Sequence, residues 1–216
     1  AQAWLRKLAQ QQNIVIGQRL KRYDTIVDKL ASGRSKDLST MHDIAGVRAI
    51  FRSIEELNDF RWKMRLSRAQ HELLHNPDKF DYINGPKSTG YRGIHEIMER
   101  QVQAQSGIPW NGLKFEVQLR TAVQHAWATA VEVYDDTHLA RFKFQESENP
   151  AYEQFVIASE ILSRVHENSY GTVRDLSDIQ LANRFQELEH QAGTVEMLHG
   201  LQIAVSQRPL KKNSIL

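Results

Sequence analysis

The sequence predicts an α+β protein. Segments with the period of a helix and segments that alternate like a strand both occur along the chain. They do not follow the regular strand–helix–strand order that a parallel α/β sheet requires. The length of 216 residues suits one domain of ordinary size with an appendage. Because no internal repeat is visible, we expect a mixed domain of helices and strands rather than a repeat array.

The composition excludes several classes of protein and site. Hydrophobic residues make up 41% of the chain and charged residues 25%, which is typical of a folded globular protein. No run of 18 apolar residues occurs, so we expect no membrane-spanning segment and no membrane partner. The absence of cysteine excludes disulfides, thiolate zinc sites and iron–sulfur clusters, and it fits the cytoplasmic location that we expect. Because the chain begins without Met, we also expect it to be part of a longer protein.

Positive charge is concentrated near the N-terminus. The net charge of the chain is only +2, but residues 1–36 carry eight basic and two acidic side chains, a local charge of +6. The basic side chains are Arg6, Lys7, Arg19, Lys21, Arg22, Lys29, Arg34 and Lys36. A basic segment beside a slightly acidic remainder suggests an anion-binding site rather than a general polyanion-binding surface.

Two helices are expected within the first 31 residues. The segments 2–12 and 16–31 have helical spacing, and Gly33 provides a C-terminal stop for the second helix. The buried stripe of the second helix would consist of Leu20, Tyr23, Val27 and Leu30.

A strand and a third helix are expected next. In residues 46–52, every second side chain from Val47 onward is apolar, so one face of this strand should be buried. Ser53 and Glu56 have the spacing of a capping box, which opens a helix that we expect to reach about residue 74. The inward face of this helix would consist of Leu57, Phe60 and Met64.

The remainder of the chain is expected to contain a Gly- and Pro-rich loop over residues 84–93, two strands and three helices. The strands are predicted at 94–103 and 113–120, and the helices at 122–135, 151–167 and 178–199. We expect residues 1–149 to form the main domain and residues 150–216 to form a helical extension that packs on it.

The first group of residues that points to chemistry lies in the expected helix 16–31. Lys21, Thr25 and Lys29 are four residues apart, so on one helix they would form a single ridge. Two ammonium groups and a hydroxyl in a row are suited to successive phosphate groups. A solvated charged helix face is the alternative that this pattern leaves open.

The second group surrounds the strand at 46–52. Asp43 precedes this strand, and Arg48 faces away from its apolar side, so the two could supply a metal ligand and a cation that holds a nucleotide. A turn or cap aspartate is the commoner use of such an acid. The pair His42-Asp43 also suggests a His-Asp phosphohydrolase, but that reading needs further His and Asp ligands that nothing in the sequence places beside it.

The third group is the loop 84–93. Gly85 and Gly90 have the spacing of a P-loop, but Tyr91 and Arg92 occupy the positions that require Lys and Ser or Thr, so this is not a Walker A motif. Lys87 with the hydroxyls beside it could still bind phosphate. Tyr91 could stack on a base, with His95 following in the next strand. A surface turn with a half-buried tyrosine is the alternative.

The fourth group lies on the expected strand 113–120. Glu116, Gln118 and Arg120 alternate with apolar residues and therefore share one face. An edge strand open to water would have the same pattern. Because an apolar helix follows directly, we expect the polar face to line a cleft, where Glu116 would be a second carboxylate able to hold Mg²⁺.

Together, these four groups resemble the synthetase domain of the RelA/SpoT-type alarmone synthetases, in particular its small and toxin-like members. The segment Arg19–Lys29 resembles the family's R-x-K-x-x-x-S-I-x-x-K motif, and Asp43–Arg48 resembles its D-x-x-x-x-R motif. Lys79–His95 resembles its K-D-Y-I…P-K-x-N-G-Y-x-S-[IL]-H loop, although Thr89 and Gly93 replace its Asn and Ser. Glu116–Thr121 resembles its E-x-Q-[IL]-R-T strand, and the four motifs occur in the family's order.

The resemblance implies a fold and an activity. The fold would be a mixed β-sheet flanked by helices, related to the nucleotidyltransferases. The activity would be that of a GTP/GDP diphosphokinase, an enzyme that transfers the β,γ-pyrophosphate of ATP to the 3′-hydroxyl of GDP or GTP with Mg²⁺ and so makes the alarmone (p)ppGpp. Little covalent chemistry falls to the protein in such a transfer, and positioning and charge neutralisation dominate.

The resemblance also implies a role for each matched residue. ATP would be bound by Arg19, Lys21, Thr25, Lys29 and Arg48, with the two arginines on either side of the adenine. Asp43 and Glu116 would hold Mg²⁺ and act as the catalytic residues, Glu116 also helping to deprotonate the acceptor hydroxyl. The acceptor nucleotide would be bound by Lys79, Lys87, Tyr91, His95, Gln118 and Arg120, with Tyr91 stacked on its base.

Three alternatives stay open from the sequence. The acceptor could be the 3′ end of tRNA, as in toxin-like members, or an adenine nucleotide that would yield (p)ppApp. The chain could also be a non-enzymatic module that senses nucleotides. Residues 150–216 lie outside the motifs and could bind an antitoxin or mediate self-association.

Overall fold

The chain forms two compact units. The computed structural model describes residues 1–10, 12–38, 41–67, 71–138 and 149–206. The first unit, here the sheet unit, consists of Ala1–Lys87 and Arg92–His125. The second, here the helical unit, consists of Ser88–Tyr91 and Ala126–Leu216. That residues 150–216 pack on a main domain of residues 1–149 stays a prediction.

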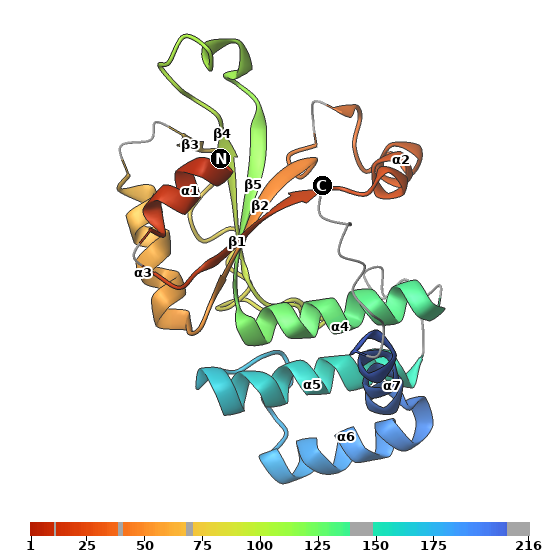
Figure 1. Cartoon of the computed structure of the whole chain (residues 1–216). Coiled ribbons are helices and arrows are strands. Elements are labelled where there is room, and N and C mark those ends of the chain that lie inside the picture. The colour runs from red at the N-terminus through yellow and green to blue at the C-terminus, as the bar shows by residue number, and fades with distance from the viewer. Residues whose placement is uncertain (11, 39–40, 68–70, 139–148, 207–216) are drawn as a thin grey trace. The chain divides into compact units, whose positions relative to one another are not determined.

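A five-stranded mixed β-sheet organises the sheet unit (Figure 1). Its spatial order is β1-β2-β5-β4-β3, and β2 and β5 are the parallel pair while the neighbouring pairs are antiparallel. The strands are β1 (Val15–Leu20), β2 (Ala45–Phe51), β3 (Glu72–Leu73), β4 (Ile94–Glu99) and β5 (Lys114–Thr121). This architecture confirms the expected α+β class and the mixed sheet with flanking helices.

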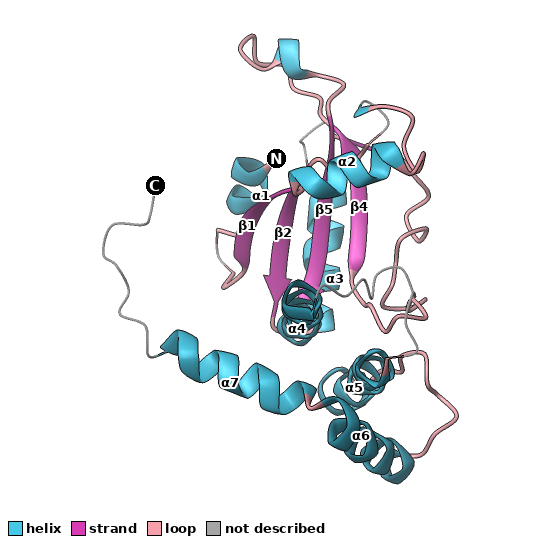
Figure 2. Cartoon of the chain, turned by 90° about the vertical axis from the view of Figure 1, so that its right-hand side faces the viewer, coloured by secondary structure: helices cyan, strands magenta, loops and turns pink. Residues whose placement is uncertain are grey.

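Helices cover the sheet unequally. Helices α1 (Gln2–Leu8) and α3 (Ile54–Arg65) lie on one side of the sheet, and α2 (Tyr23–Ala31) lies on the other (Figures 1 and 2). The side with α1 and α3 contains the apolar core, which buries Leu5, Leu57, Phe60 and Met64 from the helices and Val47, Ala49, Phe51, Ile94, Met98, Phe115, Val117 and Leu119 from the strands. The alternation expected for β2 and β5 and the inward face expected for α3 are therefore confirmed.

The expected helix 16–31 is wrong in its first part. Residues Val15–Leu20 form strand β1, which pairs antiparallel with β2, and α2 begins only at Tyr23. Leu20, Tyr23 and Val27, expected to be buried, are 79%, 78% and 44% exposed, and no residue of α2 is fully buried. The β-branched run before Gly17 favours a strand, and pairing with β2 satisfies its backbone, so tertiary pairing outweighs the apparent helical period. Consequently Lys21, which precedes α2, shares no helical ridge with Thr25 and Lys29.

Two other helices are shorter than expected. Helix α1 ends at Leu8 rather than at residue 12. At the start of α3, Ser53 Oγ accepts a hydrogen bond from the Glu56 amide at 3.2 Å, as the capping signature predicts, but the Glu56 carboxylate accepts from the Arg52 amide instead of that of Ser53. Helix α3 ends at Arg65, nine residues before its expected end, and Glu72–Leu73 pairs with β4 as an edge strand.

The remaining elements occur where the sequence predicts them, with two differences: β4 ends at Glu99 rather than at residue 103, and the last expected helix is divided. The connection between β4 and β5 contains a short 3₁₀ helix, Ile108–Trp110, and Gly112 has a φ of 84° in the turn just before β5. Helices α4 (Ala122–His138) and α5 (Pro150–Glu167) match predicted helices. The single helix expected at 178–199 is two helices, α6 (Asp178–Ala192) and α7 (Thr194–Ser206), because Gly193 adopts the left-handed conformation between them. None of the described helices is long and apolar enough to cross a membrane.

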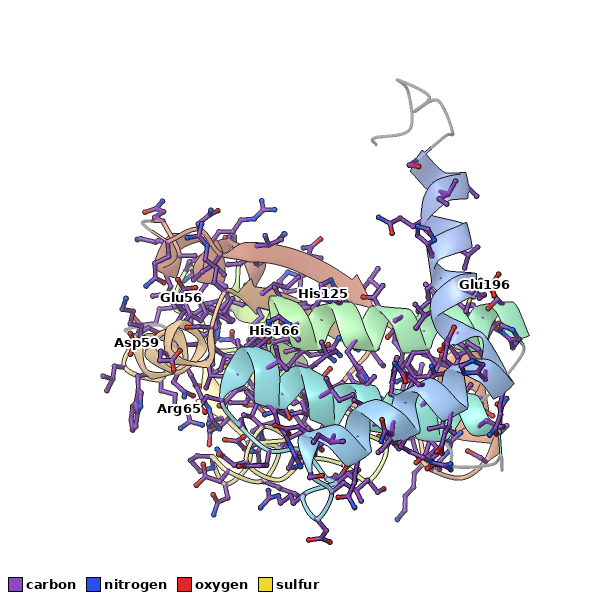
Figure 3. All side chains as sticks on the ribbon, turned by 90° about the horizontal axis from the view of Figure 1, so that it is seen from below. Glu56, Asp59, Arg65, His125, His166 and Glu196 are labelled. Carbon is purple, nitrogen blue, oxygen red and sulfur yellow. The ribbon has the colours of Figure 1, made fainter. Side chains whose placement is uncertain are left out.

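The helical unit packs through two apolar clusters. Trp127, Val131 and Tyr134 of α4 pack with Phe155 of α5, and Ile157 of α5 packs with Leu181 and Leu188 of α6. Figure 3 labels His166 on α5 and Glu196 on α7. The short segment Ser88–Tyr91 belongs to this unit because Gly90 is pressed against α4 and α5.

Gly90 is required by both its conformation and its surroundings. Its φ is 82°, and a Cβ there would lie 3.1 Å from the Ser159 Cβ and 3.2 Å from the Trp127 ring. The Gly90 carbonyl accepts a hydrogen bond from Ser159 Oγ at 2.6 Å. The segment that carries Tyr91 is therefore held against the helices by a contact that only glycine permits.

Gly90→Ala is expected to destabilise the helical unit by about 2–4 kcal/mol, since left-handed strain and overpacking add together. Gly193→Ala is the matched control, because Gly193 has a φ of 60° but open space around it, so only strain of about 1–2 kcal/mol is expected. Urea unfolding followed by tryptophan fluorescence measures both. Equal losses in the two variants would contradict the close packing at Gly90.

Candidate functional site

One face of the sheet is lined by polar side chains. Residues that pair across neighbouring strands lie on the same face of a sheet. Arg19 pairs with Gly46, Gly46 with Glu116, and His95 with Gln118, so one face can be followed across β1, β2, β5 and β4. We call this surface the polar face; it consists of Arg19, Arg48, His95, Glu116, Gln118 and Arg120. It is opposite to the core face and therefore on the side of the sheet where α2 lies (Figure 2). The predicted common face of Glu116, Gln118 and Arg120 is confirmed.

Glu116 is at the centre of the polar face and is held on several sides. Its residue exposure is only 7%. His95 Nδ1 lies 2.7 Å from Oε1, Gln118 Nε2 donates to Oε2 at 2.6 Å, and Arg19 Nη1 lies 3.5 Å from Oε2. Gly46 makes room for this arrangement, because a Cβ at that position would lie 3.1 Å from the Glu116 carbonyl oxygen.

These contacts keep Glu116 ionised. Burial alone would raise the pKa of its carboxyl group. The hydrogen bond and charge of His95, the hydrogen bond from Gln118 and the charge of Arg19 outweigh burial, and the pKa lies below its ordinary value. Glu116 is therefore an anionic group with fixed orientation at neutral pH.

Asp43 forms a second centre beside the start of β2. Its Oδ2 accepts hydrogen bonds from Lys21 Nζ at 2.5 Å and from Lys29 Nζ at 3.0 Å. The two lysines that sequence analysis placed on one ridge thus converge on one carboxylate from β1's end and from α2. Within the described part of the chain, the buried Asp43 Oδ1 has no hydrogen-bond partner.

The pKa values at this centre move in the same direction. Burial would raise the pKa of Asp43, but the hydrogen bonds and charges of Lys21 and Lys29 lower it below its ordinary value. The pKa of Lys21 is lowered, mainly by burial, although its contact with Asp43 opposes that shift. The carboxylate is therefore ionised at neutral pH and has one oxygen available for a further ligand.

A chain of side-chain contacts connects the loop before β4 to Glu116. It runs from Lys87 through Tyr82 to His95. The Lys87 ammonium lies 4.3 Å from the centre of the Tyr82 ring, and the Tyr82 ring meets the His95 ring edge-on at 5.4 Å. Desolvation lowers the pKa of Lys87, and the charge of Glu116 opposes this shift. A cation and an aromatic ring therefore lie beside the His95–Glu116 pair.

Lys114 lies beside His42, the residue that precedes Asp43. Lys114 Nζ lies 3.5 Å from His42 Nε2. The pKa of His42 is lowered, first by burial and then by the charge of Lys114, with smaller contributions from Lys29 and Lys79. Lys79 Nζ lies 5.1 Å from the centre of the Phe80 ring, and the role expected for it at an acceptor phosphate stays a prediction.

The remaining expected residues have different surroundings. Tyr91 belongs to the helical unit, where it packs with the cluster that contains Trp127 and Phe155. Thr25 lies half-buried on α2 and takes no part in the contacts of Asp43. Arg48 and Arg120 do lie on the polar face, and Arg120 Nη2 donates to Gln118 Oε1 at 3.4 Å.

Sequence reasoning missed three side chains of this region. Tyr82 received no role although it lies within a matched motif, His42 was considered only for a His-Asp phosphohydrolase, and Lys114, two residues before the Glu116–Thr121 motif, received no role. For Tyr82, the available signal was an aromatic residue between two lysines in the loop before a strand. For His42 and Lys114, only the pairing of β2 with β5 brings the two together.

The donor set fits a magnesium ion held mainly by substrate. Among the described residues, no three His, Asp, Glu or Cys side chains come together as a metal site. Mg²⁺ is usually held by one or two carboxylates together with substrate phosphates and water. Asp43, with its unpartnered Oδ1, and Glu116 are of the required kind, although the binding of a metal here stays a prediction.

Comparison with known proteins gives a consistent set of matches. The family model described as "Region found in RelA / SpoT proteins" matches residues 18–138. The GTP pyrophosphokinase YwaC of Bacillus subtilis (strain 168) is 33% identical over 117 residues, which are 51% of this chain and 52% of that protein. The chain therefore spans about half the length of this curated relative.

Solved structures with the same fold include small alarmone synthetases. The small alarmone synthetase 1 of Bacillus subtilis bound to its product pppGpp matches with a TM-score of 0.63 and 22% identity, covering 77% of this chain and 84% of that chain. The small alarmone synthetase 2 of Bacillus subtilis has a TM-score of 0.61 and 24% identity, covering 77% and 84%. The protein smu.1046c of Streptococcus mutans UA159 has a TM-score of 0.58 and 25% identity, covering 84% and 90%. These likenesses confirm the fold.

Asp43→Asn is expected to lower the free energy of unfolding at pH 7 by about 1–3 kcal/mol in metal- and nucleotide-free protein, because the buried Lys21 ammonium loses its charged partner. Since the pKa of Asp43 is lowered in the folded state, its contribution is complete above the ordinary carboxyl pKa of about 4 and is lost as the pH falls through the folded pKa. Urea unfolding of the wild type and of Asp43→Asn from pH 7 to pH 3 measures their free energies of unfolding. The difference between the two free energies should become smaller toward pH 3.

Asp28→Asn is the matched control for this experiment. Asp28 pairs with Arg34 at an exposed position, so its loss should change the free energy of unfolding by less than about 1 kcal/mol. A gap between wild type and Asp43→Asn that stays constant with pH would contradict the assignment.

Proposed function

The chain belongs to the RelA/SpoT family, and from this premise we propose that it is an ATP-dependent pyrophosphokinase. It would transfer the β,γ-pyrophosphate of ATP to the 3′-hydroxyl of GDP or GTP. The products would be AMP and the alarmone (p)ppGpp. The relative that matches half of this chain is a GTP pyrophosphokinase, which supports guanine nucleotides as acceptors.

The observation that carries the proposal is the pair of ionised carboxylates, Asp43 and Glu116, set among cations. Glu116 lies opposite Gly46 in the β2–β5 pairing, and Asp43 precedes Gly46 by three residues, which is roughly 10 Å of chain at most. Lys21, Lys29, Arg19 and Lys87 surround the two acids. Transfer of a pyrophosphate group needs this combination, because the migrating group and both nucleotides are anionic.

The donor nucleotide is proposed to bind on the side of β1 and β2. Lys21 and Lys29 converge at one point, and they would hold ATP phosphates as point charges. Arg19 and Arg48 project from the polar face on adjacent strands, where their planar guanidinium groups could stack on the adenine from either side. Thr25, half-buried on α2, completes the set expected for ATP.

The acceptor is proposed to bind on the side of β4 and β5. Lys79 and Lys87 would meet its phosphates, and His95, Gln118 and Arg120 would orient its ribose and base. The resemblance alone supports Tyr91 as the residue that would stack on the acceptor's base. These assignments extend the family pattern, residue by residue, to the positions described above.

Glu116 would serve the chemical step as the proton acceptor. The acceptor 3′-oxygen attacks the β-phosphorus of ATP, the bond from that phosphorus to the α-phosphate oxygen breaks, and the hydroxyl proton passes to a Glu116 carboxylate oxygen. Its lowered pKa keeps it ionised beforehand, and His95 at 2.7 Å fixes its orientation. Lys21 and Lys29 would balance charge on the phosphates as AMP departs.

Asp43 and Glu116 would hold Mg²⁺ in this site. The bound ion would supply further charge neutralisation at the phosphate oxygens and help to align them. The unpartnered Asp43 Oδ1 is the observation that favours a ligand there.

The first test is a transfer assay with acceptors kept apart. Protein, Mg²⁺ and γ-³²P-labelled ATP are incubated separately with GDP, GTP, ATP or bulk tRNA, and the products are resolved by thin-layer chromatography and gel electrophoresis. Label on a guanine nucleotide supports the proposal. Labelled (p)ppApp as the only product would identify an enzyme with an adenine nucleotide as acceptor. Label only on tRNA would identify a toxin-like enzyme with salt-sensitive binding, and no transfer of label to any acceptor would favour a nucleotide sensor.

Glu116→Gln is expected to lower the transfer rate by at least about 10²–10³-fold, because it removes the proton acceptor and a metal ligand while preserving size. Binding of a non-hydrolysable ATP analogue should change much less, since the proposed ATP phosphate ligands are Lys21 and Lys29. Rate measurements with the control Glu55→Gln, an exposed carboxylate on α3, should match wild type. A transfer rate in Glu116→Gln equal to that of the wild type would contradict the proposed catalytic role.

A further inference from the structure

A buried group of charges lies on the core side of β4, opposite to His95. Glu96 is fully buried, and its Oε1 accepts hydrogen bonds from Arg61 Nε and Arg65 Nη2, both at 2.6 Å. Arg61 also donates through Nη1 to Asp81 Oδ2 at 3.1 Å. Both arginines lie on α3, one turn apart, and Figure 3 labels Arg65 there. We call these four side chains the buried network.

The buried network holds the backbone of the loop 76–85. Arg61 Nη2 donates to the Pro77 carbonyl at 2.5 Å. Asp81 Oδ1 accepts from the amides of Ile83 and Asn84 at 3.2 and 3.1 Å. Arg61 thus uses separate donors for a strand residue, a loop carboxylate and a loop carbonyl, and the carboxylate in turn fixes the next turn of the loop.

The same loop carries groups that reach the polar face. The amide of Tyr82 donates to the Gly93 carbonyl at 2.9 Å, and the amide of His95 donates to the Phe80 carbonyl at 3.1 Å. The Tyr82 ring contacts both His95 and Lys87. A displacement of Asp81 would therefore move Tyr82 and, through its ring, the neighbours of Glu116.

Stability alone does not account for the buried network. Two carboxylates and two guanidinium groups lose their hydration here, and replacing such groups by apolar side chains is often neutral or stabilising. Apolar residues could fill the space between α3 and β4. They could not accept from the Ile83 and Asn84 amides or donate to the Pro77 carbonyl, which are the contacts that define the loop.

We propose that Arg61 is a positioning residue of the acceptor site, which acts through Asp81 to set the places of Tyr82, Lys79 and Lys87. This inference rests on the proposed pyrophosphokinase function. The ligand concerned is the acceptor nucleotide. The prediction separates the acceptor from ATP, because the hydrogen bonds of the proposed ATP-binding residues Lys21 and Lys29 go to Asp43 and not to the loop 76–85 in the described structure.

Steady-state transfer kinetics of the full chain test the inference. Arg61→Ala should raise the KM for GDP by about 10–100-fold while the KM for ATP changes by less than about 2-fold, because a misplacement of about 1 Å is costly at the site it affects. Arg61→Lys should lie between wild type and Arg61→Ala, since one ammonium replaces three directed donors. Lys63→Ala is the matched control, an exposed cation on the same helix, and should behave as wild type.

A second variant and a second measurement guard against misfolding. Asp81→Asn keeps the size of the side chain but weakens the pair with Arg61, and it should show the same selective rise in acceptor KM. Hydrogen exchange should be faster at the Ile83 and Asn84 amides in Arg61→Lys than in Lys63→Ala. The positioning role would be overturned if the variants lost affinity for ATP and GDP equally and in proportion to their loss of folded protein. It would also be overturned if folded Arg61→Ala and Asp81→Asn had the same KM for GDP as the wild type.

The outcomes for the two proposals are separable. A wild-type protein that transfers no pyrophosphate to GDP or GTP refutes the proposed function before any variant is compared. An active wild type whose acceptor KM does not respond to Arg61→Ala or Asp81→Asn refutes the positioning role and leaves the function intact.

Discussion

The parallel pairing of β2 with β5 places Gly46 beside Glu116 and brings together two segments that are far apart in the sequence. This pairing aligns Arg48 with Gln118 and sets the start of β2, where Asp43 lies, next to the start of β5, where Lys114 lies. Gly46 is suited to this contact because any side chain there would press on the Glu116 backbone. Without this register, a one-residue slip would turn Glu116 into the apolar core.

The pairing also determines where charged side chains gather around the two carboxylates. Each carboxylate is bound by more than one basic group, Asp43 by Lys21 and Lys29, and Glu116 by His95 and Arg19. The excess of basic groups gives this region a positive character that suits phosphates, although the chain as a whole carries only +2. The lowered pKa values of both acids have the same cause, since cationic and hydrogen-bonding neighbours outweigh burial.

The long loop before β4 has two separate supports. Residues before Lys87 are tied to α3 and β4 through Asp81 and Arg61. Residues after Lys87 are tied to α4 and α5 through Gly90. Loops that carry function are commonly less constrained than the elements they connect, so this degree of anchoring is notable for a segment without regular structure. Three of the proposed acceptor groups, Lys79, Lys87 and Tyr91, lie along this anchored loop, so under the proposed function the anchoring would also position the acceptor.

By itself, the sequence determined the fold class, the strands β2, β4 and β5, the loop before β4 and the placement of Asp43 before one strand and Glu116 on another. Strict alternation along β5 assigned Glu116, Gln118 and Arg120 to one face because side-chain direction in a strand depends only on position. The local signal at Ser53 likewise acts within a few residues, so it can be recognised without a structure.

Only the tertiary structure decided the rest. Val15–Leu20 forms a strand because it pairs with β2, and a helical period read from one segment contains no information about that partner. Lys21 and Lys29 meet at Asp43 rather than along a helix, and Arg61 reaches Asp81 and Glu96 across the core. Such contacts join residues that are distant along the chain, and the free energy that fixes them arises from burial and long-range pairing, which local sequence patterns do not record.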